Sequence, residues 1–393
     1  MNHMKINYTL YGIGLTGGVR TLLTLANGLA EKGHEVSFNI LERRVKIDLP
    51  IDKKINITQG NVPWLIKLFD PMFYIYSRGT RKTDYLMLEG FLGKMGIKIS
   101  FDLDKALNNT IPEADVSVAT AFPTAFPVYL SKSKAKIYQM QHFETVFSNS
   151  QYDTRRALAS YKLPLTRIAN SSWLKNKLKE ELNVNSNLVP WGIDTEIFNT
   201  KKIESKNLSK IFNRSEKYSY ILSLGKSTRW KGLSELFAAL EYIKKKEPNL
   251  KLMLILYGQE PTLKNSSPIE CEYVFKPSDK ELVYLYQNSD VVVTPSHSES
   301  FPLPPLEGMA CGAKVVTTPY GVEDYAKNGY NSIIVKPNDI KSLAEGIIKT
   351  ITDERLNEIL RKNGPHTAKQ FTWKKSIDKI ETIYKKSLDV TDS

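Results

Sequence analysis

Short apolar runs alternate with helical patterns along the whole chain, and this alternation predicts an α/β fold with parallel sheets. The first extended run, at residues 5–10, leads into a glycine-containing loop and then into apolar residues at helical spacing that end near Gly33. Residues 34–40 are the expected second strand. A strand, a glycine loop, a helix and a second strand in this order are typical of the start of a doubly wound sheet.

The same alternation continues through the first half and begins again in the second half. Further strands of the first half are expected at residues 114–119, 136–140 and 167–169. After a polar stretch rich in Asn and Lys at residues 199–216, strands are expected at 220–224, 252–257, 272–275, 290–294, 314–317 and 332–335. The restart predicts two Rossmann-like domains, residues 1–195 and 196–370, with a site in the cleft at the carboxyl ends of their strands.

Composition agrees with a folded chain of two such domains. Hydrophobic residues make up 41% and charged residues 25% of the 393 positions. No run of 18 apolar residues occurs, and the first residues lack the apolar stretch of a signal peptide, so we expect a cytoplasmic protein. The two cysteines, Cys271 and Cys311, are far apart and lack Cys or His neighbours at metal spacing, which argues against a disulfide framework or a zinc site.

The formal net charge of +13 suits an anionic partner, but charge alone does not identify one. The basic excess is shared by both halves and no nucleic-acid-binding motif accompanies it, so we expect no nucleic-acid partner. Residues 63–100 combine many aromatic side chains with basic ones such as Arg78, Arg81 and Lys82. This mixture fits peripheral contact with an anionic membrane and equally fits the core of an inserted helical pair.

Two loops that follow predicted first strands have the composition of phosphate sites. The first contains Gly12, Gly14, Gly17 and Gly18 before a helix, where backbone amides can approach a phosphate; a tight turn is the alternative. Its spacing does not match the dinucleotide fingerprint G-x-G-x-x-G, which argues against a nicotinamide enzyme. The second loop, residues 225–232, carries Lys226 and Lys231, which suit a diphosphate; a solvated basic turn is its alternative.

Residues 295–312 form the segment richest in candidate chemistry. It follows a buried strand and contains two glutamates, Glu299 and Glu307. Pro304 and Pro305 are expected to preset the first turn of a helix, which leaves residues 300–303 as a loop with free amides. We expect Glu307 in the first helical turn, where its carboxylate can accept hydrogen bonds from two vicinal hydroxyls such as those of a ribose.

On these motifs the sequence resembles the retaining GT-B glycosyltransferases with the Glu, seven residues, Glu signature, that is glycosyltransferase family 4 of the group 1 type. Residues 189–198 also resemble the interdomain stretch of this family, and Lys226 and Lys231 match its donor-phosphate Arg and Lys. Lys226 replaces the usual Arg and Trp191 the usual Asn. The resemblance implies an acceptor-side domain, a donor-binding domain, and a C-terminal helix at residues 371–393 that crosses back to the first domain.

The resemblance also implies roles for individual residues. Glu299, His142 and Lys231 are the expected catalytic residues, although His142 is open to a purely structural interpretation and Glu144 is in doubt as a second carboxylate. The expected donor-binding residues share loop or helix-start positions: Gly17, Gly18, Lys226, Lys231, Ser300, Phe301, Leu303 and Glu307.

The implied activity is transfer of a hexose-type sugar, with retention, from a nucleotide-sugar donor to a glycan or lipid-linked acceptor in cell-surface polysaccharide or glycoconjugate synthesis. No cofactor and no metal are expected, and Asp102 and Asp104 are interpreted as helix-capping and surface charge rather than as metal ligands. A GT-B phosphorylase-like enzyme and a catalytically inactive GT-B binding scaffold remain the alternatives.

Overall fold

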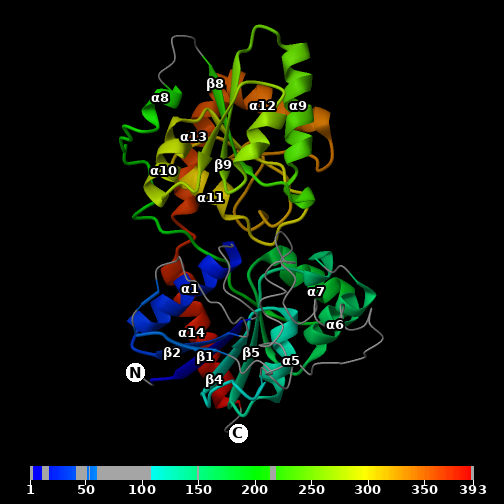
Figure 1. Cartoon of the computed structure of the whole chain (residues 1–393), viewed down its shortest axis with the longest axis vertical. Helices are drawn as coiled ribbons and strands as arrows, with labels where there is room; N and C mark the ends of the chain where they lie inside the picture. Colours follow the sequence, from blue (N-terminus) through cyan, green and yellow to red (C-terminus); the bar gives the residue numbers. More distant parts are fainter. Residues whose placement is uncertain are drawn as a thin grey trace, which may run out of the picture. The chain divides into compact units, whose positions relative to one another are not determined.

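The chain is divided into two compact units, each built around one parallel sheet (Figure 1). The computed structural model describes residues 3–10, 17–40, 51–52, 54–59, 108–147, 150–212 and 218–390. The first unit comprises Met1–Ala169, Lys177–Val189 and Ile377–Ser393. The second comprises Asn170–Asn176 and Pro190–Ser376.

The sheet of the first unit has seven strands in the order β3-β2-β1-β4-β5-β6-β7, and all neighbouring strands are parallel. Its inner strands are buried along their length, which explains why they can be identified from continuous apolar runs. The strands are β1 Lys5–Leu10, β2 Glu35–Ile40, β3 Asn56–Gln59, β4 Val116–Ala119, β5 Ala135–Met140, β6 Thr166–Ala169 and β7 Asn187–Leu188.

Helices connect these strands, as parallel neighbours require. Helix α1 buries an apolar stripe that includes Leu22, Leu25 and Leu29, while Arg20 and Glu31 are exposed. The described helices before β7 are α1 Gly17–Glu31, α5 Phe122–Leu130, η1 Glu144–Phe147, α6 Gln151–Lys162 and α7 Ser172–Leu182, of which the first residues, up to Asn176, belong to the second unit.

The C-terminal helix α14, Trp373–Asp389, contributes most of its length to the first unit. Its Tyr384 is fully buried, and the Tyr384 hydroxyl lies 3.1 Å from the hydroxyl of Tyr8 on β1. A Cβ at Gly28 of α1 would lie 2.2 Å from Ile377 Cδ1, so the absence of a side chain at Gly28 lets the two helices pack. The predicted return of the C-terminal helix to the first domain agrees with these contacts.

A cluster of charges fastens the outer face of α14. Glu381 accepts hydrogen bonds from Lys32 and Lys385, and its Oε1 lies 3.3 Å from His34 Nε2. Burial opposes ionisation of Glu381, but the two lysines outweigh it and lower the pKa of the carboxyl to about 2. This helix is therefore held to the first unit by both apolar and charged contacts.

The second unit repeats the same design. Its six strands lie in the order β10-β9-β8-β11-β12-β13, again with every pair parallel. In both sheets the order changes direction between the first and fourth strands, which is where doubly wound folds bind ligands. The strands are β8 Ser219–Gly225, β9 Leu252–Gly258, β10 Cys271–Phe275, β11 Val291–Thr294, β12 Val315–Thr317 and β13 Ile333–Ile334.

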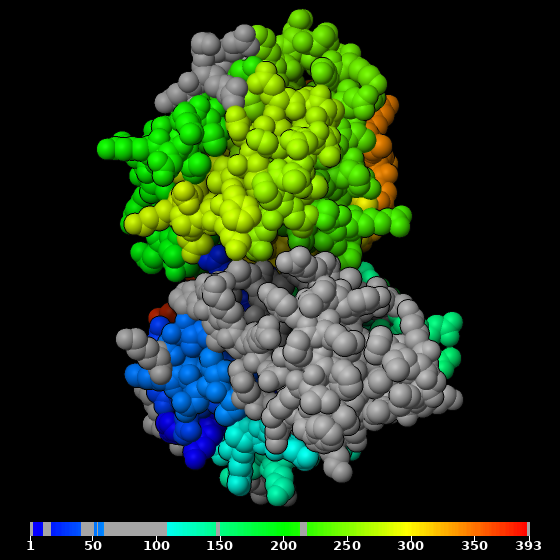
Figure 2. Space-filling model, in the orientation of Figure 1, coloured from blue at the N-terminus to red at the C-terminus, as the bar shows by residue number. Residues whose placement is uncertain are grey.

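Alternate residues of these strands build two cores. Ile221 and Leu254 pack with α9 and α12 on one face, whereas Leu222 and Ile255 pack with α10 and α11 on the other. Figure 2 shows one surface of this unit, formed by the green to yellow residues that run from α8 to α10. The helices are α8 Ser209–Phe212, η2 Arg229–Lys231, α9 Leu233–Lys246, η3 Pro261–Ser266, α10 Asp279–Asn288, α11 Leu303–Ala310, α12 Ile340–Thr352 and α13 Glu354–Ala368.

The two chain segments at the limits of the second unit run beside each other within it. Ile193 pairs with Thr372 in a parallel bridge, and the Ser376 hydroxyl donates to the Pro190 carbonyl oxygen at 2.7 Å. A Cβ at Gly192 would lie 2.1 Å from the Thr372 carbonyl carbon, so this approach requires glycine.

The predicted fold class of two doubly wound α/β domains is confirmed. Residues 63–100, Asp102 and Asp104, and the loop positions Gly12 and Gly14 lie outside the described residues, so the predictions made for them are not tested. In the described part of the chain, no helix has the length and apolar character that crossing a membrane requires.

Candidate functional site

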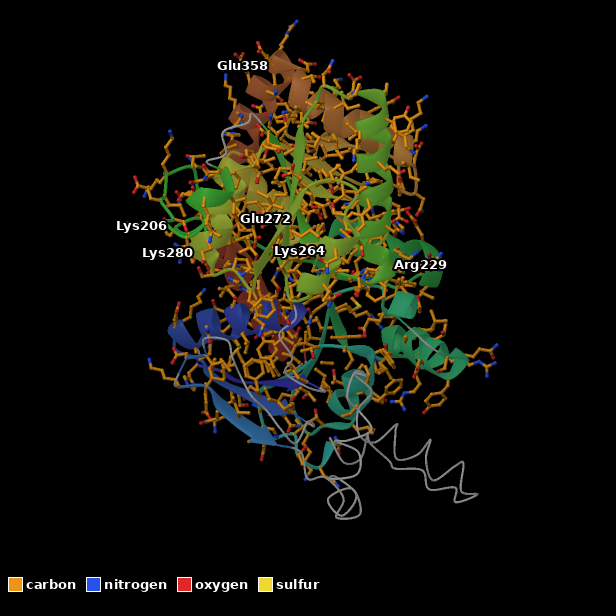
Figure 3. The ribbon with its side chains drawn as sticks, turned by 45° about the horizontal axis from the view of Figure 1, so that its top comes forward. Lys206, Arg229, Lys264, Glu272, Lys280 and Glu358 are labelled. Carbon is orange, nitrogen blue, oxygen red and sulfur yellow. The ribbon has the colours of Figure 1, made fainter. Side chains whose placement is uncertain are left out.

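The predicted site residues of the second unit gather where its sheet changes direction, at the carboxyl ends of β8 and β11. Lys226 and Lys231 lie in the loop after β8, and Glu299 lies in the loop after β11. Arg229, the other cation of the first loop, is exposed on η2 and is labelled at the surface of the second unit in Figure 3.

Backbone contacts hold these two loops against each other. Gly232 has φ +70°, and a Cβ there would lie 2.0 Å from the Pro295 carbonyl oxygen, so only glycine fits. The His297 amide donates to the Trp230 carbonyl oxygen at 2.7 Å. These contacts place Lys231 Nζ 2.5 Å from Glu299 Oε1, an ion pair in which Glu299 has 14% of its side-chain surface exposed.

Residues 318–325 also hold the loop after β11 in place. The Tyr325 hydroxyl donates to the Pro302 carbonyl oxygen at 2.6 Å, and the Thr318 hydroxyl donates to that of Ser296 at 2.5 Å. Gly321 has φ +72°, and a Cβ there would lie 2.5 Å from the Ser300 carbonyl oxygen. The backbone of residues 296–302 is therefore preorganised, which favours a binding role for its amides.

The side chains of Ser300 and Phe301 serve this framework. The Ser300 hydroxyl donates to Asn170, and the Phe301 ring is buried against Trp191, with 6.3 Å between the ring centroids. Trp191, which departs from the pattern of the resembled family, thus packs behind the loop. The backbone amides of Ser300 and Phe301 are therefore the groups that we expect to contact a ligand.

Glu307 lies deeper than the sequence predicted. Helix α11 begins at Leu303 after the N-cap residue Pro302, so Glu307 is past the first turn and the prediction of a first-turn glutamate is wrong. The reason is that Leu303 already has helical geometry, which places Pro304 and Pro305 one step further into the helix. Glu307 is buried, and its Oε2 accepts a hydrogen bond of 2.9 Å from the Tyr286 hydroxyl.

Sequence reasoning missed a second acidic partner in this unit, Glu260. Its carboxylate accepts hydrogen bonds from the Lys226 ammonium and, at 2.9 Å, from the Ser227 amide. Burial opposes ionisation, but these bonds hold the pKa of Glu260 below its usual value. The available signal was its position directly after β9, at the same edge of the sheet as Lys226.

Three predicted residues belong to the first unit. A Cβ at Gly17 would meet no atom within 4 Å, whereas one at Gly18 would lie 2.5 Å from Gln141 Oε1. The start of α1 is therefore next to the loop that carries His142. His142 is buried and its Nδ1 lies 3.2 Å from the Phe143 carbonyl oxygen, so in this contact Nδ1 bears the proton.

Glu144, the carboxylate in doubt, anchors that same loop. It accepts hydrogen bonds from the Tyr138 hydroxyl at 2.8 Å and from the Phe122 amide at the start of α5 at 2.9 Å. Although part of its side chain reaches solvent, burial raises the pKa of the Glu144 carboxyl to about 7. These hydrogen bonds explain why Glu144 lies close to His142 without assigning it a catalytic role.

The assembled groups of the second unit are complementary to a molecule with both phosphates and hydroxyls. Lysine ammonium groups and loop amides bind phosphate oxygens, and carboxylates accept hydrogen bonds from hydroxyls. The described residues contain no group of three or more His, Cys, Asp or Glu side chains arranged to hold a metal ion.

Comparison with known proteins agrees with this chemistry. Residues 204–367 match the family model of the glycosyl transferases group 1. An uncharacterised glycosyltransferase of Haemophilus influenzae is 25% identical over 368 residues, which cover 90% of this chain and 92% of that protein. A capsular polysaccharide biosynthesis glycosyltransferase, CapM of Staphylococcus aureus, is 31% identical over 206 residues, which cover 49% of this chain and 52% of CapM.

A solved structure supports the fold over almost the whole chain. The structure of Anabaena HepE in complex with UDP and glucose superposes with a TM-score of 0.70 at 16% sequence identity, and it covers 97% of this chain and 99% of HepE. At this identity the likeness concerns the fold, which is that of the GT-B glycosyltransferases.

Proposed function

Through residues 204–367 the chain belongs to the group 1 glycosyl transferases, and we propose that it transfers a hexose-type sugar from a nucleotide-sugar donor with retention of anomeric configuration. The proposed acceptor is a glycan or a lipid-linked glycan in cell-surface polysaccharide or glycoconjugate synthesis. The likeness to CapM supports this assignment of the pathway.

One observation carries the proposal: where the second sheet changes direction, Lys231 pairs with Glu299 and Lys226 pairs with Glu260. Glu299 and Glu307 lie at the two ends of a segment whose backbone is fixed, and Lys231 pairs with Glu299 at 2.5 Å. A scaffold without activity would have no need for this arrangement of charges. We therefore favour an enzyme over the inactive binding scaffold.

Each residue has a proposed role in the donor complex. Lys226, Lys231 and the loop amides bind the diphosphate, and the three N–H donors of a lysine allow it to keep its carboxylate partner while it binds phosphate. Gly17 and Gly18 provide a close backbone approach in the first unit. Glu307 binds the ribose hydroxyls, and Glu299 and His142 orient the hydroxyls of the transferred sugar.

The proposed chemistry breaks the bond between the anomeric carbon and the donor phosphate oxygen, and forms the bond from the acceptor oxygen on the same face. The acceptor proton passes to the leaving phosphate, so no protein nucleophile is needed. The lysines stabilise the negative charge that develops on the diphosphate. Because cationic side chains provide this charge, we propose that turnover needs no metal ion.

UDP is the first nucleotide to test, because the HepE structure contains UDP and glucose. We also propose that the enzyme works in the cytoplasm, at an anionic membrane surface contacted by residues 63–100. Binding to vesicles that rises with anionic lipid content and falls when Arg78, Arg81 and Lys82 become Ser would support this contact; no dependence on lipid charge would favour an internal packing role.

A thermal-shift screen across UDP-, GDP- and ADP-sugars tests the proposed function. A donor at 100 times its dissociation constant should stabilise the fold by about 2.7 kcal/mol. The stabilising donor is then incubated with candidate acceptors, and the product is examined by NMR for the anomeric configuration. Release of a nucleoside diphosphate is expected; consumption of a sugar phosphate with no role for nucleotide sugars would favour the phosphorylase-like alternative.

A further inference from the structure

A chain of two buried phenols lies behind Glu307. Tyr286 of α10 donates to Glu307 Oε2 at 2.9 Å, and the hydroxyl of Tyr257 on β9 lies 3.3 Å from that of Tyr286. Tyr286 is fully buried and Tyr257 has 7% of its surface exposed. All three residues belong to the second unit.

The direction of the hydrogen bonds in this chain follows from its chemistry. Burial, together with Tyr257 and Glu307, raises the pKa of Tyr286 well above its ordinary value of 10.0, so its phenol remains protonated. The Tyr286 proton is used in the bond to the carboxylate. Tyr257 must therefore donate to the Tyr286 oxygen, which polarises the Tyr286 hydroxyl as a donor.

Packing fixes the position of the Tyr286 ring. Phe198 contacts it in a tilted edge arrangement with centroids 6.3 Å apart, and the Tyr257 ring lies at 6.5 Å in a T-shaped arrangement. A ring held in this way offers its hydroxyl at one place. A glutamate side chain has three rotatable bonds, and ordering such a long polar side chain costs conformational entropy. Because the Tyr286 hydroxyl already restricts one Glu307 carboxylate oxygen, less side-chain entropy is lost when a ligand binds.

We propose that Tyr286 is a positioning residue for donor binding: its phenol holds the Glu307 carboxylate in the orientation that accepts the ribose hydroxyls, and Tyr257 supports Tyr286 in that role. A carboxylate can accept about four hydrogen bonds, so a bond from Tyr286 is compatible with bonds to a ligand. This inference rests on the proposed function, in which Glu307 binds the ribose.

The test compares Tyr286→Phe with wild type by isothermal titration calorimetry, using whichever of UDP, GDP and ADP binds wild type most tightly. Loss of a hydrogen bond to a charged group predicts affinity about tenfold weaker. At saturating donor, kcat should stay within about twofold, because the lost orientation affects ground state and transition state alike. Tyr257→Phe should weaken affinity by less, about two- to threefold.

Tyr284→Phe is the matched control. Tyr284 lies on the same helix and is buried in the same core, but its ring packs against Phe212 instead. It should bind nucleotide as wild type does. An equal loss of affinity in Tyr284→Phe and Tyr286→Phe would mean that helix α10 is perturbed generally, and would overturn the proposal.

Two further measurements separate positioning from mere packing. In a Glu307→Ala background, Tyr286→Phe should cost no additional affinity, since the carboxylate that it orients is gone. With a 2′,3′-dideoxyribose nucleotide, wild type and Tyr286→Phe should bind equally. A full, additive loss in either measurement would contradict the inference. If Glu307→Ala itself leaves nucleotide affinity unchanged, the proposed function fails at its ribose site instead.

Discussion

The two units share a strand order but differ in what they place at the point where the sheet changes direction. In the first unit, helix α1 begins with Gly17 and Gly18, which have no side chains. In the second, the equivalent loop after β8 carries Lys226 and Lys231, and the loop after β11 carries Glu299. One topology therefore places two glycines at the start of the first helix in one unit and charged side chains in the corresponding loops of the other.

This difference shows that the chemistry is a property of the loops and not of the sheet. Close backbone contacts also support the charged loops, because Gly232 and Gly321 let backbone approach backbone around them. Substitutions of the charged residues in these loops should therefore affect ligand binding and turnover. Substitutions of the residues that hold α14 to the rest of the first unit should affect the free energy of unfolding.

The largest effect is expected for Glu299→Ala. Without this carboxylate the transferred sugar can misalign as charge develops on it, so kcat should fall on the order of a hundredfold or more. Steady-state kinetics at saturating donor measures this loss, and calorimetry should give nucleotide affinity within a few fold of wild type. A variant that folds and turns over normally would remove Glu299 from the catalytic residues.

Glu307→Ala should instead weaken nucleotide binding more than it lowers turnover. Loss of hydrogen bonds to a charged group predicts nucleotide binding weaker by about 1.5 to 3 kcal/mol. Turnover at saturating donor should change little, because the ribose contact is present in ground state and transition state alike. Glu307→Gln is the control that keeps the side-chain volume. A loss confined to kcat would reverse the assignment of the two glutamates.

In the first unit, Glu381→Gln should lower the free energy of unfolding by about 1 to 2 kcal/mol at pH 7, since its lysine partners are partly exposed and screened. The pKa of Glu381 is lowered to about 2 from 4.5, so its contribution is present above pH 4.5 and is lost as pH falls through 2.

Urea unfolding of both proteins at pH 7 and near pH 2.5 measures this dependence. The difference in the free energy of unfolding between wild type and Glu381→Gln should be smaller at the lower pH. A gap that is constant across this range would mean that the carboxylate charge does not hold α14 to the first unit.

A smaller effect, of opposite sign, is expected for Lys276→Gly. Lys276 has φ +45°, a left-handed conformation that costs a residue with a side chain about 1 kcal/mol. Glycine should therefore raise the free energy of unfolding by roughly 0.5 kcal/mol, after loss of the contact between the Lys276 ammonium and the Phe275 ring. Asn338→Gly, at φ 56°, is the matched comparison and should gain less because Asn tolerates this region. Destabilisation by Lys276→Gly would show that the Lys276 side chain stabilises the fold by more than its left-handed backbone conformation costs.

No effect at all is expected from metal removal. If the lysines supply the positive charge at the diphosphate, transfer should proceed at an unchanged rate in excess EDTA. Activity that EDTA abolishes and Mn²⁺ restores would contradict the assignment of phosphate binding to the lysine loop.

Much of the fold could be predicted because its strands are buried on both faces. The expected run at residues 220–224 differs from β8 by one residue at each end, and the run at residues 5–10 coincides with β1. The switch-point position of Lys226, Lys231 and Glu299 could also be predicted, since residues that follow parallel strands meet at one edge.

Partners contributed by distant segments could not be predicted. Glu260 meets Lys226 across 34 positions, and Tyr286 meets Glu307 across 21, and neither spacing has a local pattern. The helical start at Leu303 was missed because the two prolines gave a stronger signal one step later. The buried position of Glu307 likewise depends on how α10 and α11 pack.

Hydrogen–deuterium exchange with and without the tightest-binding nucleoside diphosphate tests the contrast between the two units most directly. If the second unit holds the donor nucleotide, protection should be greatest at residues 226–232 and 296–308, and Glu307→Ala should reduce it at the same ligand concentration. Protection at saturating nucleotide that is confined to residues 17–22 of the first unit would contradict the account.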